Sequence, residues 1–319
     1  MNILIADSFP ESYQSELIKN GHQITFNPAL QGDALGEALG DHEILIVRST
    51  KVDAAAIDAG TALRLVIRAG AGTNSIDKAH AASKGVRVCN VPGANAIAVA
   101  ELVIGLIIAI DRHIPDNVSD LRNKVWAKKK YASAQGLYGQ KLGLLGLGAI
   151  GLAVAERAAA FGIRVHALAK PGRSQDAEKR ISDLGIVQLA SLDDLLATCD
   201  IVSLHLPVTP ETNKMVDKTF LDKMKHGAML INTSRGDLVD EAALIEAMES
   251  KGIRAGLDVY DNEPGAGDDR FDSAIAAHPG VCGTHHIGAS TEQAQMAVAE
   301  GVLQVVRSYQ QGDLQNCVN

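Results

Sequence analysis

The sequence predicts an α/β protein made of two doubly wound parallel-sheet domains with a cleft between them. Three observations support this prediction: short apolar runs alternate with helix-like segments, the runs end in glycine or polar residues, and one run leads through a glycine-rich turn into an alanine-rich segment. Alternating strands and helices are typical of a parallel sheet covered by helices. At 319 residues the chain is long enough for two domains with sizeable cores.

The composition agrees with this class and disfavours others. Aromatic residues make up 3% of the chain, whereas small and aliphatic residues are plentiful, which suits buried parallel strands. The formal charge of −8 argues against a nucleic-acid partner, so an anionic ligand needs a local basic pocket. The four cysteines (Cys89, Cys199, Cys282, Cys317) form no C-x-x-C pair, and we expect free thiols in a reducing compartment and no metal site.

The first residues of the chain and its longest apolar stretch indicate where the protein resides. The chain enters a strand-like run at once, without a basic leader or a cleavage site. The longest apolar stretch, 96–110, contains Glu101 and is too short to cross a bilayer. We therefore expect a cytoplasmic protein with no membrane partner.

The first domain is expected over residues 1–97 and 291–319. Its predicted strands are 3–6, 23–26, 44–47, 65–67 and 86–89, and its predicted helices are 11–19, 32–40, 54–60 and 77–84. Polar or glycine-rich residues follow three strands, in Asp7-Ser8, Arg48-Ser49-Thr50 and the run 68–74. Because ligands bind at the carboxyl ends of strands in open α/β sheets, we expect ligand contacts there.

The second domain is expected over residues 98–290. A long helix over about 94–110 leads into it, and a second helical part is expected to carry Trp126 and the lysines at 128–130. Six strands are predicted, the usual number in a dinucleotide-binding domain, with helices at 150–161, 192–197, 218–224 and 241–249 between them; the strands are 142–145, 165–168, 201–206, 229–232, 255–259 and 281–284. After a last helix over 291–308, residues 310–319 are expected to rejoin the first domain.

The glycine-rich turn is Gly146-x-Gly148-x-x-Gly151, with Ala149 and Ile150 between the glycines. In a Rossmann-like dinucleotide site the first glycine makes the turn, the second lets backbone approach a pyrophosphate, and the third lets the helix pack on its strand. The helix N-terminus then offers free N–H groups to the anion. Glycines also mark ordinary turns, but the flanking strand and helix favour the dinucleotide site.

Three polar residues follow predicted strands of the second half: Arg235, Glu263 and His286. Taken singly, such residues are more often surface or capping residues. Together, beside a dinucleotide site, they form a set in which His286 exchanges a proton, Glu263 orients the imidazole and Arg235 binds a 2-oxo acid carboxylate. The adjacent His285 is the competing candidate for the proton exchange.

Five motifs resemble those of the D-isomer-specific 2-hydroxyacid dehydrogenases. They are Gly146-Leu-Gly148-Ala-Ile-Gly151, His205-Leu-Pro207-Val-Thr209-Pro210-Glu-Thr212, Asn232-Thr-Ser-Arg235-Gly236, Leu257-Asp258-Val259-Tyr260 and His286-Ile-Gly-Ala-Ser-Thr291. The resemblance implies two Rossmann-like or flavodoxin-like domains, a catalytic set of Arg235, Glu263 and His286, and Asp258 near the nicotinamide. It also implies a homodimer, for which the stretch 96–110 is a candidate contact; that stretch equally suits an intramolecular core.

The same resemblance implies a cofactor site and a substrate site. The implied cofactor-binding residues are Gly146, Gly148, Ala149, Ile150, Gly151, Ala169, Lys170, Arg173, His205, Pro207, Thr212, Thr233, Ser234, Asp258 and Gly288. The first half resembles the D-3-phosphoglycerate dehydrogenase subfamily in Val47-Arg48-Ser49, 67–72 and 90–95, where the arginines face a substrate phosphate. The implied substrate-binding residues are Arg48, Ser49, Arg68, Ala69 and Gly70.

Alternatives remain open for both the activity and the substrate. Arg48 and Arg68 are also compatible with ion pairs at a domain edge, in a hydroxypyruvate, glyoxylate or other D-2-hydroxyacid reductase. A protein of another class, an NAD(H)-sensing corepressor, resembles this fold too. Because the sequence ends at residue 319, we expect no regulatory C-terminal domain of the kind that some phosphoglycerate dehydrogenases carry.

The expected cofactor is NAD(P), with NADP(H) favoured. About 20 residues beyond the glycine turn, an NAD enzyme places an acidic residue on the ribose 2′-hydroxyl. Here that position holds Ala169, followed by Lys170 and Arg173, which could attract a 2′-phosphate. The alternative is a neutral NAD site with both cations in solvent.

Overall fold

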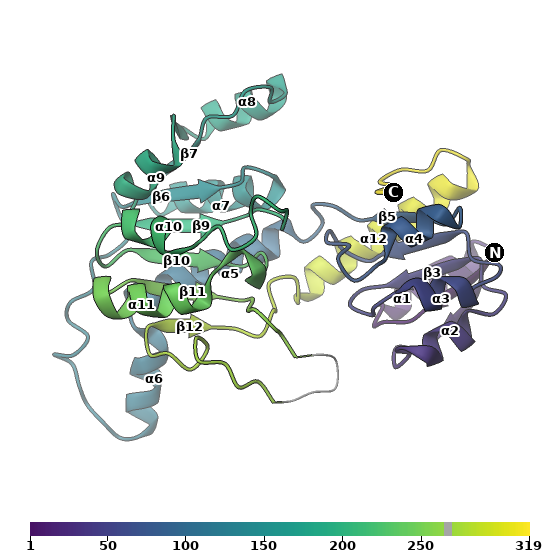
Figure 1. The fold of residues 1–319 in the computed structure, drawn as a ribbon, viewed down its shortest axis with the longest axis horizontal. Coiled ribbons are helices and arrows are strands. Elements are labelled where there is room, and N and C mark those ends of the chain that lie inside the picture. The colour runs from purple at the N-terminus through teal and green to yellow at the C-terminus, as the bar shows by residue number, and fades with distance from the viewer. Residues whose placement is uncertain (265–269) are drawn as a thin grey trace. The chain divides into compact units, whose positions relative to one another are not determined.

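The computed structural model describes residues 1–264 and 270–319, and the chain forms two compact units. Unit 1 comprises Met1–Asn95 with Ala289–Asn319, and unit 2 comprises Ala96–Gly288. Each unit contains one parallel β-sheet covered by helices, as the ribbon in Figure 1 shows. The predicted fold class is therefore confirmed, while the assignment of substrate and cofactor to the two units and the cleft between them stay predictions.

The sheet of unit 1 has five parallel strands in the order β2-β1-β3-β4-β5. This is the flavodoxin-like order, in which the direction of winding reverses between β1 and β3. The strands are β1 (Asn2–Ile5), β2 (Gln23–Phe26), β3 (Ile44–Val47), β4 (Leu65–Arg68) and β5 (Arg87–Asn90); the helices are α1 (Glu11–Lys19), α2 (Asp33–Leu39), α3 (Ala54–Ala59), α4 (Lys78–Ser83) and α12 (Glu292–Gln310). All five strands and the helices between them lie where the sequence places them.

Unit 2 has seven parallel strands in the order β12-β11-β10-β9-β6-β7-β8. They are β6 (Lys141–Leu145), β7 (Arg164–Leu168), β8 (Val187–Leu189), β9 (Ile201–Leu204), β10 (Met229–Asn232), β11 (Arg254–Leu257) and β12 (Val281–Gly283). The helices are α5 (Ala96–Asp111), α6 (Ile114–Arg122), α7 (Ala149–Ala160), α8 (Gln175–Asp183), α9 (Leu192–Thr198), α10 (Lys218–Lys223) and α11 (Glu241–Lys251), with the 3₁₀ turn Gly236–Leu238. The winding direction reverses between β6 and β9.

The prediction of six strands is wrong by one edge strand. β8 contains three residues, none of them buried, so it has no apolar run of its own. The helix before it, α8, was also missed, because charged residues dominate it and only Ile181 is buried. Both elements depend on pairing with β7 and on the core rather than on a strong local pattern.

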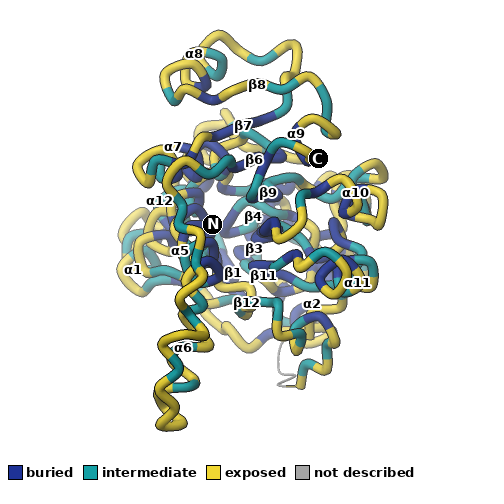
Figure 2. The backbone as a smooth tube through the Cα atoms, turned by 90° about the vertical axis from the view of Figure 1, so that its left-hand side faces the viewer, coloured by how far each residue is buried: buried dark blue, intermediate teal, exposed yellow. Residues whose placement is uncertain are grey.

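The buried cores explain why apolar runs mark the strands. Every residue of β3, β9 and β10 is buried, as expected for central strands covered on both faces. Figure 2 shows the strands mainly in dark blue and the outer surfaces of the helices in yellow. The long apolar helix α5 packs against α7 and β11 inside unit 2, so its apolar surface forms intramolecular core.

The segment after α5 differs from the prediction. α6 begins at Ile114 and ends at Arg122, where Lys124 with φ +63° takes the chain out of the helix. Trp126 follows it in irregular structure and the lysines at 128–130 lie in turns, so the prediction of a helix that carries them is wrong. None of the residues of α6 is buried, and Figure 2 shows α6 in yellow and teal.

The end of the chain returns to unit 1, as predicted. Cys317 forms an isolated antiparallel bridge with Cys89 of β5, beside the edge of the five-stranded sheet. Figure 1 places the C-terminus next to β5. The last residues therefore cover part of an edge that the parallel strands leave unpaired.

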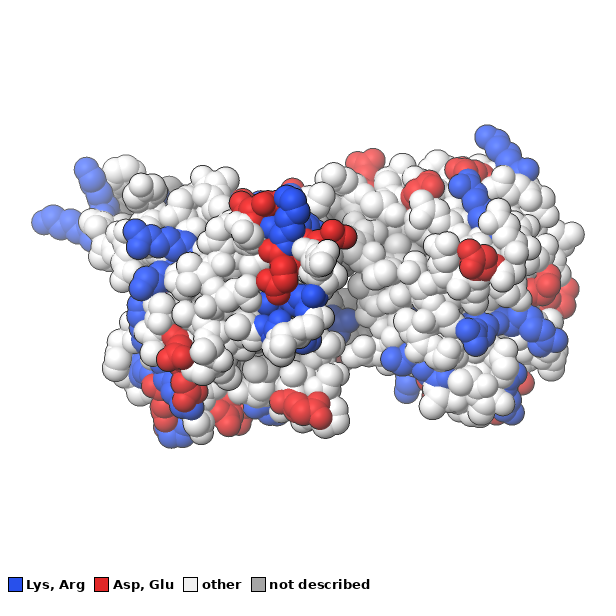
Figure 3. Space-filling model, turned by 90° about the horizontal axis from the view of Figure 1, so that it is seen from above, with Lys and Arg blue, Asp and Glu red and all other residues white. Residues whose placement is uncertain are grey.

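Two surveys of the described residues bear on ligands and membranes. Within 1–264 and 270–319, no three His, Cys, Asp or Glu side chains are grouped so that they could hold a metal ion. In the same ranges no helix is both long and apolar enough to cross a membrane. On the face of the described residues drawn in Figure 3, basic and acidic side chains are interspersed over both units.

Candidate active site

The glycine turn joins β6 to α7, and Gly146 and Gly151 each have a separate steric reason. Gly146 has φ +107°, and a Cβ there would collide with the backbone carbonyl of His205. A Cβ on Gly151 would collide with the carbonyl of Gly146, so this glycine brings α7 close to its own turn. Gly148, at the N-cap of α7, faces open space. The turn is thus tightly packed against backbone at Gly146 and Gly151 and open at Gly148.

The turn lies at the reversal of winding between β6 and β9, where ligands bind in doubly wound sheets. The first turn of α7, with Ala149 and Ile150, has backbone N–H groups without helical partners. These donors and the helix dipole favour an anionic group in front of Gly148. The fold therefore provides the setting that a pyrophosphate requires.

The loop after β9 is folded by its own side chains. The Thr212 hydroxyl donates to the carbonyl of Pro207 at 2.7 Å, and the Thr209 N–H donates to Thr212 Oγ1 at 2.8 Å. His205 Nε2 contacts the Ser203 hydroxyl at 3.0 Å, and burial lowers the pKa of His205 to about 4. The imidazole is therefore neutral near pH 7, and its Nδ1 is buried without a partner among the described residues.

The loop after β10 is fixed by Asn232, which is fully buried. Its Oδ1 accepts the Ser234 N–H at 3.0 Å and its amide donates to the Arg235 carbonyl at 2.8 Å. Ser234 also donates its hydroxyl proton to the carbonyl of Leu204, at the end of β9. These bonds set the direction of Thr233, Ser234 and Arg235, and the Thr233 hydroxyl is buried with no partner among the described residues.

His286 and Glu263 form a hydrogen-bonded pair in the segments that follow β12 and β11. Glu263 Oε2 lies 2.7 Å from His286 Nδ1, and Glu263 Oε1 accepts the Tyr260 N–H at 3.1 Å. Burial opposes the charge of Glu263, but the His286 hydrogen bond and charge, the Tyr260 N–H and the charge of Arg235 outweigh it and lower the pKa of Glu263. The carboxylate is therefore ionised at neutral pH. Half of the His286 side chain is exposed.

Asp258 holds the backbone that carries His286. It is 1% exposed, and its Oδ1 accepts the Thr284 hydroxyl at 2.6 Å and the Ile287 N–H at 2.8 Å. Its Oδ2 accepts the Gly288 N–H at 2.8 Å, and its own carbonyl accepts the His286 N–H at 2.8 Å. His286 has φ +51°, a conformation that needs such support. The implied place of Asp258 near the nicotinamide and the implied role of Gly288 in cofactor binding stay predictions.

Several features of unit 2 suit a nicotinamide dinucleotide. Gly148 leaves room for a pyrophosphate, and the two buried unpartnered polar atoms, His205 Nδ1 and Thr233 Oγ1, lie after β9 and β10 at the same edge of the sheet. Buried polar atoms normally have hydrogen-bond partners. Unpartnered polar atoms at the carboxyl ends of these strands, where ligands bind, are therefore consistent with a polar ligand. The residues present therefore fit this cofactor.

The end of β7 carries the residues that would meet the adenosine ribose. Ala169 and Lys170 are exposed, whereas the Arg173 side chain is only 14% exposed. Arg173 donates to the Leu168 carbonyl at 2.8 Å and to Gln188 Oε1 at 2.7 Å, and lies 3.5 Å from Glu178 Oε1. The alternative with Arg173 in solvent is therefore wrong: its guanidinium is fixed at the end of β7.

The candidate substrate residues lie in unit 1, after the neighbouring strands β3 and β4. The Asp7 carboxylate accepts the N–H groups of Arg48, Ser49 and Thr50 at 2.7, 3.1 and 3.0 Å. The Arg48 guanidinium donates to the Ser290 hydroxyl at 3.3 Å. This arrangement lies at the reversal of winding between β1 and β3.

The loop after β4 brings its arginine and glycine together. Gly70 has φ +141°, and a Cβ on it would collide with the guanidinium of Arg68. Ala69 donates its N–H to the Val47 carbonyl at 2.7 Å, so this loop is joined to the end of β3. Arg48 and Arg68 thus belong to neighbouring strand ends of one sheet.

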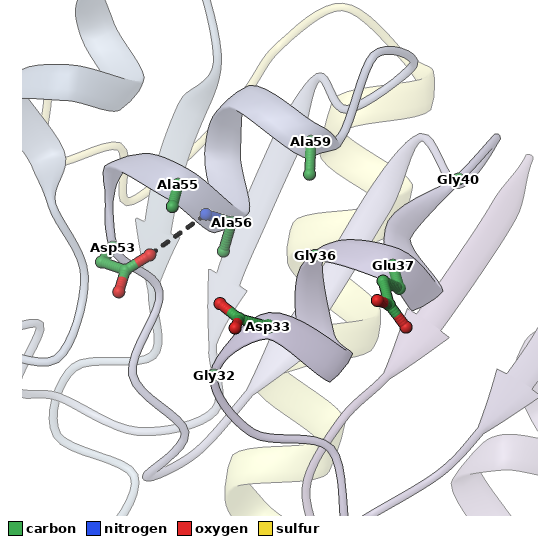
Figure 4. Close-up of a pocket in the computed structure, with 9 residues that line it drawn as sticks. All are labelled: Gly32, Asp33, Gly36, Glu37, Gly40, Asp53, Ala55, Ala56 and Ala59. Atoms are coloured by element: carbon green, nitrogen blue, oxygen red, sulfur yellow. Dashed lines mark hydrogen bonds between the residues drawn. The ribbon is translucent and has the colours of Figure 1, made fainter.

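A surface pocket of about 380 Å³ lies elsewhere in unit 1, between α2 and α3. Figure 4 shows Asp33, Glu37 and Asp53 around it, together with small residues of both helices. Asp53 accepts the Ala56 N–H at 3.0 Å and so caps α3. The carboxylates around this pocket would repel an anionic acid, and none of the predicted site residues lines the pocket.

Sequence reasoning gave no individual role to four residues that shape the two regions: Asp7, Ser290, Asn232 and Thr284. All but Ser290 stand at or just after the carboxyl end of a strand. In the sequence analysis, a position after a predicted strand served to select charged residues as candidate catalytic residues. Applied to polar side chains that can bond several backbone groups, the same signal points to Asp7, which accepts three N–H groups, and to Asn232, which accepts one N–H and donates to one carbonyl.

Comparisons with known proteins show which family the chain is similar to. Residues 104–288 match the family model described as D-isomer specific 2-hydroxyacid dehydrogenase, NAD binding domain. A hydroxypyruvate reductase of Thermotoga maritima is 41% identical over 84% of this chain and 85% of its own length. A D-3-phosphoglycerate dehydrogenase of Methanocaldococcus jannaschii is 34% identical over the whole chain, which spans 59% of that relative's length. The crystal structure of a glyoxylate reductase from Paecilomyes thermophila superposes with a TM-score of 0.86 at 27% identity, covering 100% of this chain and 98% of that one.

The chain belongs to the D-isomer-specific 2-hydroxyacid dehydrogenases. Unit 2 contains the family's NAD-binding domain, so the cofactor is a nicotinamide dinucleotide. The curated relatives named above are oxidoreductases, and the corepressor alternative is not favoured.

Proposed function

We propose that the protein is an NAD(P)-dependent D-2-hydroxyacid dehydrogenase that acts on a small anionic 2-oxo or 2-hydroxy acid, in the manner of D-3-phosphoglycerate dehydrogenase. One observation carries the proposal. The ionised Glu263 holds His286 by Nδ1 at the sheet edge that also carries the glycine turn and Arg235. A proton donor, a carboxylate-binding cation and a cofactor turn then belong to one unit.

The roles of the three side chains follow from their contacts. Glu263 occupies Nδ1 of His286, which leaves Nε2 for the substrate. When bound, NAD(P)H supplies the hydride that reduces C2 of the 2-oxo acid. His286, as imidazolium, gives its Nε2 proton to the oxygen on C2 as negative charge develops there, and takes it back in the reverse direction. Arg235 presents its planar fork to the substrate carboxylate and stabilises the same developing charge.

The proposed substrate is 3-phosphohydroxypyruvate, with 3-phosphoglycerate as its reduced form. Support comes from Arg48 and Arg68 at neighbouring strand ends of unit 1, where two guanidinium groups can bind a dianion. The backbone of Arg48 is fixed by Asp7, which favours a preformed site. The relatives named as D-3-phosphoglycerate dehydrogenases include several at 34–39% identity.

A hydroxypyruvate or glyoxylate reductase is the second candidate. The Thermotoga maritima hydroxypyruvate reductase has the higher identity, 41%, and the chain covers more of its length. The bond from Arg48 to Ser290 and the packing of Arg68 on Gly70 also suit a structural role for both arginines. Substrate preference decides between the two candidates.

The experiment compares NADPH and NADH oxidation with 3-phosphohydroxypyruvate and with hydroxypyruvate. We expect a higher kcat/KM for the phosphorylated acid, and we expect Arg48→Ala to raise KM for that acid while leaving KM for hydroxypyruvate nearly unchanged. A preference for hydroxypyruvate, or an equal effect of the substitution on both acids, favours the second candidate. Absence of turnover with either acid and with glyoxylate would contradict a dehydrogenase altogether.

For the cofactor we propose a preference for NADP(H). Ala169 removes the carboxylate that would repel a 2′-phosphate, the exposed Lys170 attracts it, and Arg173 is held at the end of β7 by Leu168 and Gln188. A fixed guanidinium loses little side-chain entropy when it binds an anion. The alternative is a neutral site that accepts NAD(H).

Ala169→Asp tests this preference. We expect it to lower the ratio of kcat/KM for NADPH to that for NADH by tenfold or more, about 1.4 kcal/mol, because an aspartate binds the ribose hydroxyl and repels the phosphate. Ala160→Asp serves as the control. It adds the same charge at an exposed site, the C-terminal end of α7. An unchanged ratio in Ala169→Asp would count against the assignment.

We also propose that the protein is a homodimer and that α6 with the residues just after it forms the contact. Ile114, Val118, Leu121, Val125 and Trp126 expose 38–82% of their surface there. The earlier candidate, 96–110, packs mainly inside unit 2 and offers less apolar surface. A cytoplasmic location stays a prediction.

Leu121→Asp is expected to shift the protein from dimer to monomer in sedimentation velocity, because it places a charge in an apolar contact. Ile18→Asp is the matched control, since Ile18 of α1 is also 57% exposed but lies in unit 1. A wild-type monomer, or a dimer that survives the Leu121 substitution, would contradict this contact.

A further inference from the structure

We propose that Cys89 and Cys317 form a modification site at which a small-molecule disulfide, such as oxidised glutathione, closes a reversible disulfide that fastens the C-terminal segment to β5. The proposal concerns unit 1 alone and does not depend on the function proposed above. Nothing in the spacing of the cysteines suggests it, because the two residues lie far apart in the sequence.

The backbone geometry brings the two residues face to face. Cys89 and Cys317 are partners in an antiparallel bridge. The flanking residues make the hydrogen bonds: Asn90 N–H donates to the Asn316 carbonyl at 3.2 Å, and Val318 N–H donates to the Val88 carbonyl at 2.8 Å. The cysteines are therefore a non-hydrogen-bonded pair, in which the Cα atoms are about 4.5 Å apart and the side chains point to the same face.

That spacing suits a disulfide. Disulfide-bonded cysteines have Cα atoms roughly 4.4–6.8 Å apart, so closure needs little movement of the backbone. The side chain of Cys317 packs on the core cluster that contains Cys89, and the two thiols interact directly. Both cysteines are free thiols in this structure.

The surroundings of the two thiols differ and set the order of events. Cys89 is fully buried, and burial together with the neighbouring Cys317 raises the pKa of Cys89 to about 12. Cys317 is partly exposed, with its sulfur 3.5 Å from the carbonyl and from the side-chain oxygen of Asn319. The oxidant therefore meets Cys317 first, and Cys89 resolves the product.

The exchange balances in two steps. The Cys317 thiolate attacks one sulfur of oxidised glutathione, the S–S bond of the oxidant breaks, and one glutathione thiolate leaves. Cys89 then attacks Sγ of Cys317 and breaks the mixed disulfide bond, and its proton passes to the departing glutathione sulfur, so the second glutathione leaves as a thiol. Two protein thiols are oxidised, and one small disulfide is reduced to two thiols.

The disulfide would strengthen the attachment of the C-terminal segment to β5, which otherwise involves only a few residues. Asn319 adds two side-chain bonds to the bridge: its Oδ1 accepts the Val88 N–H at 2.8 Å, and its amide donates to the Val86 carbonyl at 2.9 Å. β5 is the edge strand that these residues cover. A covalent link across so long a loop also restricts the unfolded chain.

The other two cysteines provide internal controls. Cys199 precedes β9 and Cys282 lies on β12, and β10 and β11 separate those strands in the sheet of unit 2. Cys282 is partly exposed, like Cys317, but it has no opposed thiol. It therefore tests whether exposure alone accounts for oxidation.

The test uses the full chain, incubated with graded ratios of reduced to oxidised glutathione and then alkylated. We expect peptide mass mapping to show a Cys89–Cys317 disulfide that dithiothreitol reverses, and the thermal midpoint to rise by several degrees on oxidation. Cys317→Ser should abolish both effects, whereas Cys282→Ser should retain them. A stable glutathione adduct on Cys317, no oxidation at all, or a disulfide without a change in the midpoint would overturn the proposal.

Discussion

Replacing His286 with alanine is expected to lower kcat by about 10²–10⁴-fold, the usual contribution of a positioned acid or base. The affinity for the cofactor should change little, because the glycine turn and the β9 and β10 loops do not depend on the imidazole. The loop that carries His286 should also survive, since Asp258 holds it through backbone N–H groups and the Thr284 hydroxyl. The measurement is steady-state turnover together with cofactor binding by fluorescence titration.

Two variants make this result specific. His285→Ala removes the neighbouring exposed imidazole, for which the structure shows no bond to Glu263, and should retain nearly full turnover. Glu263→Gln keeps an oxygen acceptor near Nδ1 but replaces the charged acceptor that holds the imidazole by a neutral one, so we expect an intermediate loss of kcat. Full activity of His286→Ala, or an equal loss in His285→Ala, would contradict the assignment.

Gly151→Ala is expected to destabilise the protein and to weaken cofactor binding. Its Cβ would collide with the carbonyl of Gly146, so the turn and α7 must move apart. Overpacking of this kind typically costs about 1–3 kcal/mol in the free energy of unfolding. Urea titration gives this cost, and a titration with NADPH gives the change in cofactor affinity.

Two other glycines separate the steric effect from the effect of alanine itself. Gly105→Ala lies in α5, where the new methyl group meets no atom of the described residues within 4 Å apart from the helix's own backbone and the adjoining residues, and should stabilise the protein by about 0.5–1 kcal/mol. Gly148→Ala faces equally open space and should leave stability nearly unchanged, but its methyl group occupies the approach of the pyrophosphate and should raise the Kd for cofactor. Tight cofactor binding by Gly148→Ala would remove the pyrophosphate from this position.

The central strands β1, β3 and β4 of unit 1 were predictable because each is a mostly buried, mostly apolar run bounded by turns, whereas β2 is largely exposed. A buried parallel strand needs that pattern on both faces, so local sequence and tertiary environment agree, as in Ile44–Val47. The glycine turn was predictable for a similar reason, since Gly146 requires a positive φ and a side chain at Gly146 or Gly151 would collide with backbone. Strand β8 lacked such a signal because its edge position leaves it largely exposed and its identity depends on pairing with β7.

The candidate catalytic residues could be named from their motifs, but their mutual arrangement could not. Glu263 and His286 follow different strands, and only the order of β11 and β12 in the sheet brings them within 2.7 Å. Burial and several backbone donors likewise make Asp258 a support for the His286 loop, which its position in the sequence does not reveal.

The sequence by itself determined the fold class, the strand ends and the residue types available for proton transfer and anion binding, because these depend on local patterns. The tertiary structure alone decided which distant residues meet. It fixed Arg173 at the end of β7, placed Asp7 under the Arg48 loop and set Cys317 opposite Cys89. Such contacts depend on strand order and register, which no short stretch of sequence encodes.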